Sequence, residues 1–294
     1  MGGEVVNADA MQVYRGMDIG TAKITPAERR GVPHHLLDIL NVTQTATVAE
    51  FQALARAAID DCRRRDVVPV LVGGSALYVR AILDDFVFPG TDEAVRTRLE
   101  AELAADGSGA LHRRLAETDP AAARQILPSN GRRIVRALEV IEITGSPYVA
   151  TLPEHRYVYD DVLQVGLDVP RPVLDERIAE RVDAMFDGGL LDEVRGLLSH
   201  GLRDGRTANR ALGYSQAIAV IDGELTDAEA RERTTQATRR FARRQDSWFR
   251  KDPRIGWLPY DASGLADRVV RVVGNRARSG GVVEVNTGSA DARG

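Results

Sequence analysis

The residues best suited to chemistry lie near the start of the chain, in the segment EVVNAD at positions 4–9. Val5 and Val6 predict a short buried strand, and Asn7 and Asp9 follow where that strand should end. Because ligands of open α/β sheets gather at the carboxyl ends of strands, a carboxylate there is a candidate general base. The alternative is that Asp9 caps a following helix, a position that aspartate also favours.

Two glycine-containing segments could approach a phosphate group. Residues 73–75, Gly-Gly-Ser, join an apolar run to a predicted helix whose free N–H groups could bind an anion. The alternative is a tight turn that needs positive φ. Residues 16–23, GMDIGTAK, do not match the phosphate-loop pattern G-x-x-x-x-G-K-[ST], because two residues separate Gly20 from Lys23. That pattern is absent from the whole sequence.

Arginine supplies almost all of the positive charge. Among 39 basic residues only Lys23 and Lys251 are lysines, and the net charge of the chain is -4. Residues 231–251 nevertheless contain eight basic and two acidic residues, which gives a local net charge of +6. Arg132 and Arg136 share one face of another predicted helix. Such helices can bind RNA phosphates locally, although a solvated charged face is the simpler alternative.

Strand and helix signals alternate around these residues. Apolar runs predict strands at 33–39, 67–72, 163–169 and 255–258, and helical periodicity predicts helices at 47–65, 75–83, 170–198 and 226–251. The run 67–72 is apolar throughout, as expected of a strand covered on both faces. We therefore expect an α/β core with a parallel sheet and crossover helices (1–90 and 156–275), an all-helical insertion (91–155) and a disordered tail (276–294).

Bulk composition limits the remaining possibilities. The 294 residues are 44% hydrophobic, which suffices for one large domain with an insertion. The single cysteine, Cys62, excludes an internal disulfide and offers no zinc cluster. We find no signal peptide and no apolar run of about 18 residues that could span a membrane. We expect a cytoplasmic monomer that does not bind membranes.

Six segments, taken together, resemble the tRNA dimethylallyltransferases, the IPP transferase family. They occur in the family's order: NADAMQVYRGMDIGTAK, PHHLLDI, LVGGSALYVRAIL, RRIVRALEV, NRALGYSQ and RRQDSWFRK. The resemblance implies a P-loop-NTPase-like sheet and an insertion that contacts the anticodon stem. It also implies a reaction, in which dimethylallyl diphosphate prenylates the exocyclic amine of the tRNA adenine on the 3′ side of the anticodon.

The resemblance assigns roles to individual residues. Asp9 matches the catalytic aspartate, and Lys23 and Arg210 are the candidates for binding diphosphate. Mg²⁺ is the implied cofactor. Positions that match the family's tRNA contacts are Asp9, Ala10, Met11, Gln12, Ser75, Arg96, Arg132, Arg133, Ile134, Val135, Arg136, Arg210, Ala211, Leu212, Gly213, Tyr214, Ser215, Arg243, Arg244, Gln245, Asp246, Ser247, Trp248, Phe249 and Arg250.

One feature departs from the family. Its members begin with a strand and a phosphate loop of the form GPT-x-x-GK-[ST], just before the segment that opens this sequence. We attribute the absence of this loop to a late start codon or to a truncation. Without the loop we expect no metal ligand in this chain and negligible transferase activity. Two alternatives stay open: an isopentenyltransferase acting on free adenine nucleotides, and a non-catalytic RNA-binding remnant. The arginines of 91–155 and 226–251 favour tRNA over the free nucleotide.

Overall fold

A computed structural model of the chain describes residues 2–148 and 155–271. The chain divides into two compact units, Met1–Leu83 with Tyr157–Gly294, and Asp84–Arg156. The predicted insertion, 91–155, falls within the second unit. The predicted tail, 276–294, lies outside the described residues.

Parallel strands joined by helices form the first unit, which confirms the predicted α/β class. Strand β1 (Gly3–Asn7) lies between β2 (His34–His35) and β3 (Val68–Val72). Helices α1 (Val48–Arg64) and α2 (Ala76–Leu83) follow β2 and β3 in the chain. Strand β4 (Gln164–Asp168) pairs in parallel with β5 (Ile255–Pro259) in a second sheet. All strand pairs within the two sheets are parallel.

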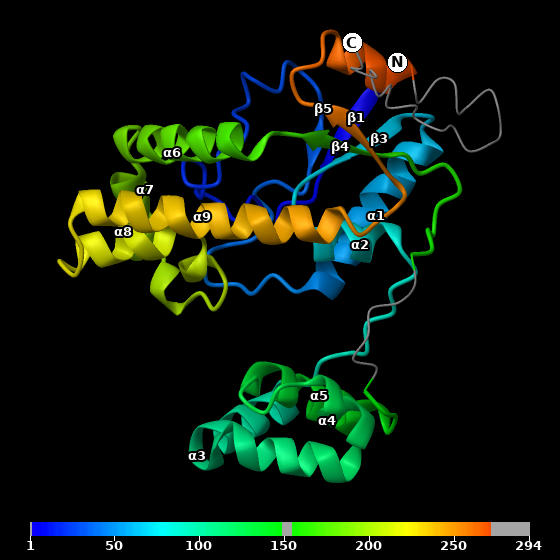
Figure 1. Cartoon of the computed structure of the whole chain (residues 1–294), viewed down its shortest axis with the longest axis vertical. Coiled ribbons are helices and arrows are strands. Elements are labelled where there is room, and N and C mark those ends of the chain that lie inside the picture. The colour runs from blue at the N-terminus through cyan, green and yellow to red at the C-terminus, as the bar shows by residue number, and fades with distance from the viewer. Residues whose placement is uncertain (1, 149–154, 272–294) are drawn as a thin grey trace, which may run out of the picture. The chain divides into compact units, whose positions relative to one another are not determined.

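The rest of the first unit is helical. Its helices are α6 (Arg171–Asp187), α7 (Leu190–Ser199), α8 (Tyr214–Ile221) and α9 (Asp227–Phe249), with short 3-10 turns η1 (Leu202–Asp204) and η2 (Ala208–Arg210). Helices α6 to α9 lie together in Figure 1. Thr226 and Glu229 form a capping box at the start of α9. Gly189, with φ of 100°, breaks the predicted helix 170–198 into α6 and α7.

The second unit consists of three helices among its described residues. They are α3 (Glu93–Thr118), α4 (Pro120–Gln125) and α5 (Gly131–Thr144). Leu99, Leu115 and Ile134 are fully buried between them and form their own apolar core. Glycine is needed at Gly131 because a Cβ there would lie 2.8 Å from the Leu103 side chain. This unit therefore has the packing of an independent helical domain.

The predicted strand 33–39 is wrong in extent. Only His34 and His35 pair with β1. Leu36 and Asp38 have φ of 65° and 58°, so the backbone leaves the extended conformation directly after His35. The side-chain amide of Asn7 donates to the Leu36 carbonyl at 3.1 Å and holds this turn against the end of β1.

Strand β3 is not covered on both faces as predicted. Val68, Val70 and Val72 are 37%, 45% and 52% exposed and line a cavity of about 1000 Å³, whose opposite wall includes Val165 and Leu167 of β4. Within the described residues β3 pairs only with β1, and β4 only with β5. Each therefore leaves one edge unpaired, and unpaired edges of parallel strands can accept a further strand.

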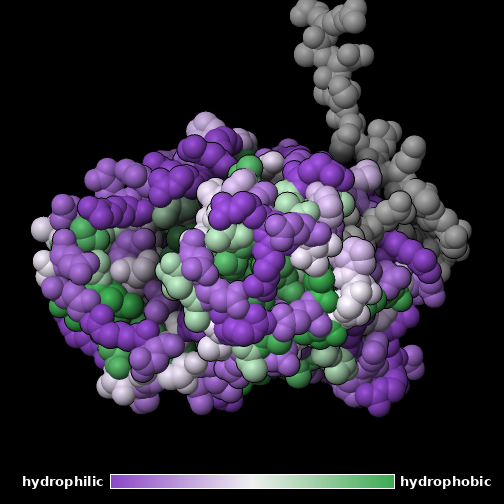
Figure 2. Space-filling model, turned by 90° about the horizontal axis from the view of Figure 1, so that it is seen from below, coloured by the Kyte–Doolittle hydropathy of each residue, from purple (hydrophilic) through white to green (hydrophobic). Residues whose placement is uncertain are grey.

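Hydrophilic residues cover most of the face seen in Figure 2, with hydrophobic ones scattered among them. None of the described helices combines the length and the apolar character that crossing a membrane requires. The only cysteine, Cys62, is buried and free.

The side chain of Glu4 connects β1 to β2 and to the end of α1. Its carboxylate accepts two hydrogen bonds from the Arg65 guanidinium, at 2.7 and 2.8 Å, and lies 2.7 Å from Nε2 of His35. The hydrogen bond from Arg65, supported by His35, lowers the pKa of Glu4 to about 2. The ionised form of Glu4 thus stabilises the attachment of α1 to the sheet.

We predict that Glu4→Gln lowers the free energy of unfolding at neutral pH and has little effect near pH 2. A carboxyl group with a depressed folded pKa stabilises the fold above its unfolded value of 4.5, and this contribution is lost as the pH falls toward about 2. Urea titrations at neutral pH and at about pH 2 measure the change. Asp61→Asn, which removes a more exposed partner of Arg65, is the matched control. Equal losses in both variants at every pH would contradict the prediction.

Candidate active site

A pocket of about 270 Å³ lies at the carboxyl ends of β1 and β3. Its polar lining comes from Asn7, Asp9, Gln12 and His34, and its apolar lining includes Val5, Ile24, Leu37 and Val72. The structure thus brings the candidate base, Asp9, together with one of the predicted glycine segments, because Gly73 also lines this pocket. A small, largely apolar pocket with a few polar groups is typical of a ligand site.

Asp9 is fixed by a short turn and not by a helix. Its backbone N–H donates to Oδ1 of Asn7 at 2.9 Å, and its own Oδ1 accepts the N–H of Met11 at 2.7 Å. The next element after β1 is the strand β2 and no helix begins at Asp9, so the helix-cap alternative is wrong. This turn uses one carboxylate oxygen and leaves Oδ2 as the oxygen that can receive a proton.

Tyr78 of α2 lies close enough to sense the charge of Asp9. Burial, and after it the nearby Tyr14 and Asp9, raise the pKa of Tyr78 to about 12. The phenol therefore stays neutral at physiological pH. The Tyr78 ring also packs edge-on against Phe51 of α1, with centroids 4.9 Å apart.

The Gly-Gly-Ser segment is packed tightly from two sides. A Cβ at Gly73 would lie 2.5 Å from the carbonyl carbon of Ala8, and one at Gly74 would lie 1.9 Å from Nε2 of Gln245. Neither glycine has positive φ, so close approach and not turn geometry explains them. Gln245 donates to the Gly74 carbonyl at 2.7 Å. Ser75 precedes α2 and is half-buried beside this contact.

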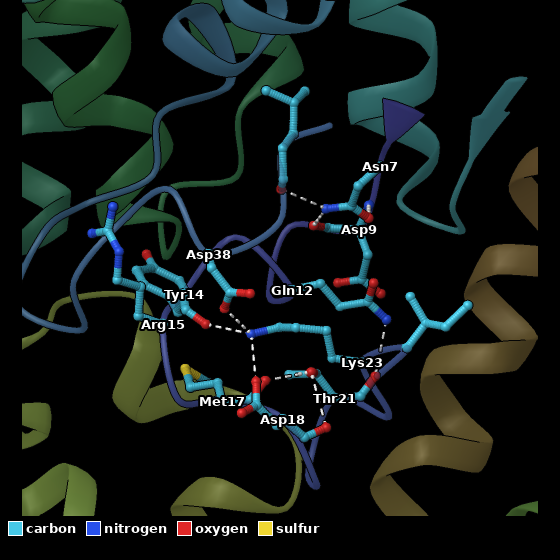
Figure 3. A network of polar contacts seen from close by, with 12 residues as sticks. Asn7, Asp9, Gln12, Tyr14, Arg15, Met17, Asp18, Thr21, Lys23 and Asp38 are labelled. Atoms are coloured by element: carbon cyan, nitrogen blue, oxygen red, sulfur yellow. Dashed lines mark hydrogen bonds and ion pairs between the residues drawn. The ribbon is translucent and has the colours of Figure 1, made fainter. Parts of the chain in front are cut away.

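Lys23 does not fit the predicted contact with diphosphate. Its ammonium donates to the carbonyl of Tyr14 at 2.7 Å and to carboxylate oxygens of Asp18 at 2.7 Å and Asp38 at 2.6 Å (Figure 3). Its side chain is 3% exposed. Since an ammonium has three N–H donors, these bonds occupy all of them. Lys23 ties the loop 16–23 to the turn that follows β2.

Several predicted tRNA contacts are buried and cannot reach a ligand through their side chains. Ile134 and Val135 belong to the core of the second unit, as expected of the apolar side of this helix. The buried members of the NRALGYSQ segment are Ala211, Gly213 and Tyr214, while Leu212 is half-buried. These residues pack beneath the surface, and their side chains do not contribute to it.

Other predicted contacts are engaged in ion pairs. Arg96 and Arg136 both bind the fully buried Glu139, and Arg136 also donates to the carbonyls of Pro89 and Gly90. These two arginines neutralise a buried carboxylate, which holds α3 and α5 together.

At the end of α9, Arg250 binds Asp168 and Asp246, and its guanidinium lies 3.7 Å from the centroid of the Trp257 ring. These contacts attach α9 to β4 and β5.

A smaller set of predicted contacts is exposed: Arg132, Arg133, Arg210, Ser215, Arg243, Arg244, Asp246, Ser247 and Trp248. Ala10, Met11 and Gln12 are half-buried beside Asp9. From the sequence we would expect the aromatic face of α9 to pack into the core, but Phe241 and Trp248 are 39% and 37% exposed, so this expectation is wrong for them. Only Phe249 of the three aromatic residues packs against the core. Aromatic rings among exposed arginines suit stacking with bases.

One group of side chains has the spacing of a metal site. The ligand atoms of Glu4, His35 and Cys62 all lie within 4.8 Å of one another. Arg65 already neutralises Glu4, and the thiol pKa is raised by burial, then by Glu4. Nitrogen and sulfur ligands also differ from the oxygen ligands that magnesium prefers. The group is therefore better explained as a buried ion-pair network.

The α/β sheet, the helical second unit and the Asp9 pocket define the class of protein. Residues 12–252 match the family described as IPP transferase, and the chain belongs to this family. It is 66% identical over 270 residues to a tRNA dimethylallyltransferase of Thermobifida fusca, covering 92% of this chain and 84% of that one. A tRNA dimethylallyltransferase of Streptomyces coelicolor is 65% identical over 268 residues, with 91% and 85% covered.

Solved structures agree with this assignment. The full-length tRNA isopentenylpyrophosphate transferase of Bacillus halodurans is 40% identical, with a TM-score of 0.65 and coverage of 94% of this chain and 88% of that one. A eukaryotic dimethylallyltransferase acting on tRNA has a TM-score of 0.82 at 24% identity, covering 97% of this chain and 75% of that one. The second comparison shows the shared fold.

We predict that Lys23→Met lowers the free energy of unfolding by about 1–3 kcal/mol. The substitution removes a buried cation from two partly exposed carboxylates and leaves the Tyr14 carbonyl without its donor. Urea unfolding at neutral pH measures the loss. Lys251→Met, at the other lysine, which is exposed, should change it by less than about 0.5 kcal/mol. Equal effects of both variants would show that Lys23 is not the anchor of this loop.

Proposed function

We propose that this chain transfers a dimethylallyl group from dimethylallyl diphosphate to the exocyclic amine of the adenine 3′ to the anticodon. The observation that carries the proposal is the Asp9 carboxylate, fixed at the end of β1 and lining a pocket of about 270 Å³. Relatives at 66% and 65% identity, named tRNA dimethylallyltransferases, support the same reaction. Since tRNA is the substrate, we propose a cytoplasmic location.

The chemistry needs a base because the amine of a neutral adenine is a poor nucleophile, with its lone pair delocalised into the ring. As the amine nitrogen bonds to the first carbon of the prenyl group, the bond from that carbon to the diphosphate oxygen breaks. The proton lost by the nitrogen passes to Oδ2 of Asp9. The target base leaves the anticodon loop to enter the pocket, and loop bases are the easiest to extrude.

The exposed arginines of α9 and η2 are the proposed RNA surface of the first unit. Arg243 and Arg244 have exposed side chains on α9, and Arg210 is exposed at the end of η2. Their guanidinium groups suit RNA phosphates, and Arg210 also stays our candidate for the diphosphate. Arg132 and Arg133 on α5 are the corresponding candidates for the anticodon stem in the second unit.

The cavity beside β3 supports a further part of the proposal, the position of the family's phosphate loop. A strand parallel to β3 would pair its exposed edge and cover Val68 and Val70. Val72 and Gly73 line both this cavity and the Asp9 pocket. A loop after such a strand would therefore begin beside Asp9. There it could hold diphosphate and Mg²⁺, the cofactor implied by the family.

Two alternatives have separate signatures. An enzyme acting on free adenine nucleotides would use Asp9 and the pocket but would not bind an anticodon stem-loop. An RNA-binding remnant would bind the stem-loop but would transfer no prenyl group, even when a phosphate loop is supplied. The expected monomeric state stays a prediction, which sedimentation can test.

We predict that the chain binds an anticodon stem-loop and that Arg243→Ala/Arg244→Ala weakens binding about tenfold at physiological salt. Loss of two phosphate contacts should also reduce the slope of log K against log salt by about 2. Fluorescence anisotropy of a labelled stem-loop measures both quantities. Arg203→Ala, which removes an arginine already paired with Asp222, is the matched control. An equal effect of that control would refute the proposed RNA surface.

We predict that prenyl transfer depends on Asp9, measured in a version of the chain extended by the family's strand and phosphate loop. In the extended version, Asp9→Ala should lower the chemical rate by about a hundredfold or more, while RNA affinity changes little. Single-turnover transfer of labelled prenyl group to a stem-loop measures this rate. A parallel loss of RNA affinity would make Asp9 a binding residue and not a base.

A further inference from the structure

Glu193 of α7 binds a row of backbone N–H groups in the loop 16–23. Its Oε2 accepts the N–H of Asp18 at 3.1 Å and of Ile19 at 2.7 Å, and its Oε1 accepts the N–H of Gly20 at 3.4 Å. Successive N–H groups that converge on one point form an anion-binding nest. Here the anion is a carboxylate of the same chain, more than 170 residues away in sequence.

Tyr214, the first residue of α8, completes this arrangement. Its hydroxyl donates to Oε1 of Glu193 at 2.5 Å, and its side chain is fully buried. Burial, then the charge of Glu193, raises the pKa of the Tyr214 phenol, which therefore keeps its proton and acts as a donor. Glu193 thus accepts four hydrogen bonds from two separate parts of the chain.

Gly20 allows the loop to approach this pair. A Cβ at Gly20 would lie 2.4 Å from the Tyr214 ring and 2.9 Å from the Leu190 side chain. Any larger residue would push the loop away from α7 and α8. Gly20, the second glycine of the segment GMDIGTAK, is therefore explained by the contact with Tyr214 and not by a phosphate.

The same loop forms part of the Asp9 pocket. The carbonyl of Thr21, next to Gly20, accepts the side-chain amide of Gln12 at 3.1 Å (Figure 3). Gln12, Ala22 and Ile24 line the pocket together with Asp9. A displacement of residues 18–20 would therefore move the pocket wall and release the Gln12 amide.

We propose that Glu193 is a positioning residue for the reaction, which holds the loop 16–23 so that Gln12 and Ile24 shape the pocket that receives the target base. The inference rests on the proposed function of the Asp9 pocket. Glu193 acts through the loop and contacts neither the base nor the RNA. The neighbouring Asp192 has an ordinary surface role, because it is 83% exposed and pairs with Arg195.

The test separates base capture from RNA binding. An anticodon stem-loop carries the fluorescent purine analogue 2-aminopurine at the target position, where stacking quenches it and eversion makes it bright. Glu193→Gln places an amide N–H against the backbone N–H groups of residues 18–20. We expect this variant to lose at least about half of the fluorescence increase, with the RNA dissociation constant within about twofold of wild type. Asp192→Asn, the matched control on the same helix turn, should keep the full signal.

Two further variants keep the proposal testable if Glu193→Gln fails to fold. Gly20→Ala leaves the carboxylate intact but displaces the loop, and it should lose the fluorescence increase in the same way. Tyr214→Phe removes only one of four hydrogen bonds and should lose less. A full fluorescence increase with both Glu193→Gln and Gly20→Ala would overturn the inference. If Glu193→Gln does not fold, a full increase with Gly20→Ala alone would overturn it. Absence of any fluorescence increase in the wild type would instead refute the proposed function.

Discussion

The account depends on the turn that fixes Asp9 at the end of β1. Asn7 binds the backbone of Asp9 and of Leu36, while Asp9 binds the N–H of Met11. Because β1 is the central strand of a three-stranded parallel sheet, the carboxylate starts from a rigid support. General-base catalysis needs this rigidity, since a proton acceptor must stay within hydrogen-bond reach of the reacting nitrogen.

Charges far from this turn stabilise the surroundings of the pocket instead of binding substrate directly. Lys23 binds Asp18 within its own loop and Asp38 after β2, and Glu193 of α7 binds the backbone of the same loop. In the second unit, the buried carboxylate of Glu139 accepts hydrogen bonds from Arg96 and Arg136. Other arginines of α9 and α5, such as Arg243, Arg244 and Arg132, are exposed, and they are the ones proposed to bind RNA phosphates.

Local patterns allowed most elements and the position of Asp9 to be predicted. Capping residues such as Thr47 and Thr226, and the break at Gly188 and Gly189, act within a few residues, so the sequence shows them directly. The partners of Lys23 could not be predicted, because a buried ammonium depends on carboxylates that the fold brings together. Glu193 and Gly20 are likewise 173 residues apart, and no local signal connects them. Burial of Ile134 and exposure of Val70 also depend on neighbours distant in sequence.

The central claim is that Asp9 accepts the proton of the target amine. A crystal structure of the chain with an anticodon stem-loop tests this most directly, through the distance between the Asp9 carboxylate and the exocyclic nitrogen of the everted adenine. We predict a distance of about 3 Å, within the range of a hydrogen bond. An everted adenine bound in the pocket with its nitrogen beyond about 5 Å from both carboxylate oxygens would contradict the account, because proton transfer could then not occur directly.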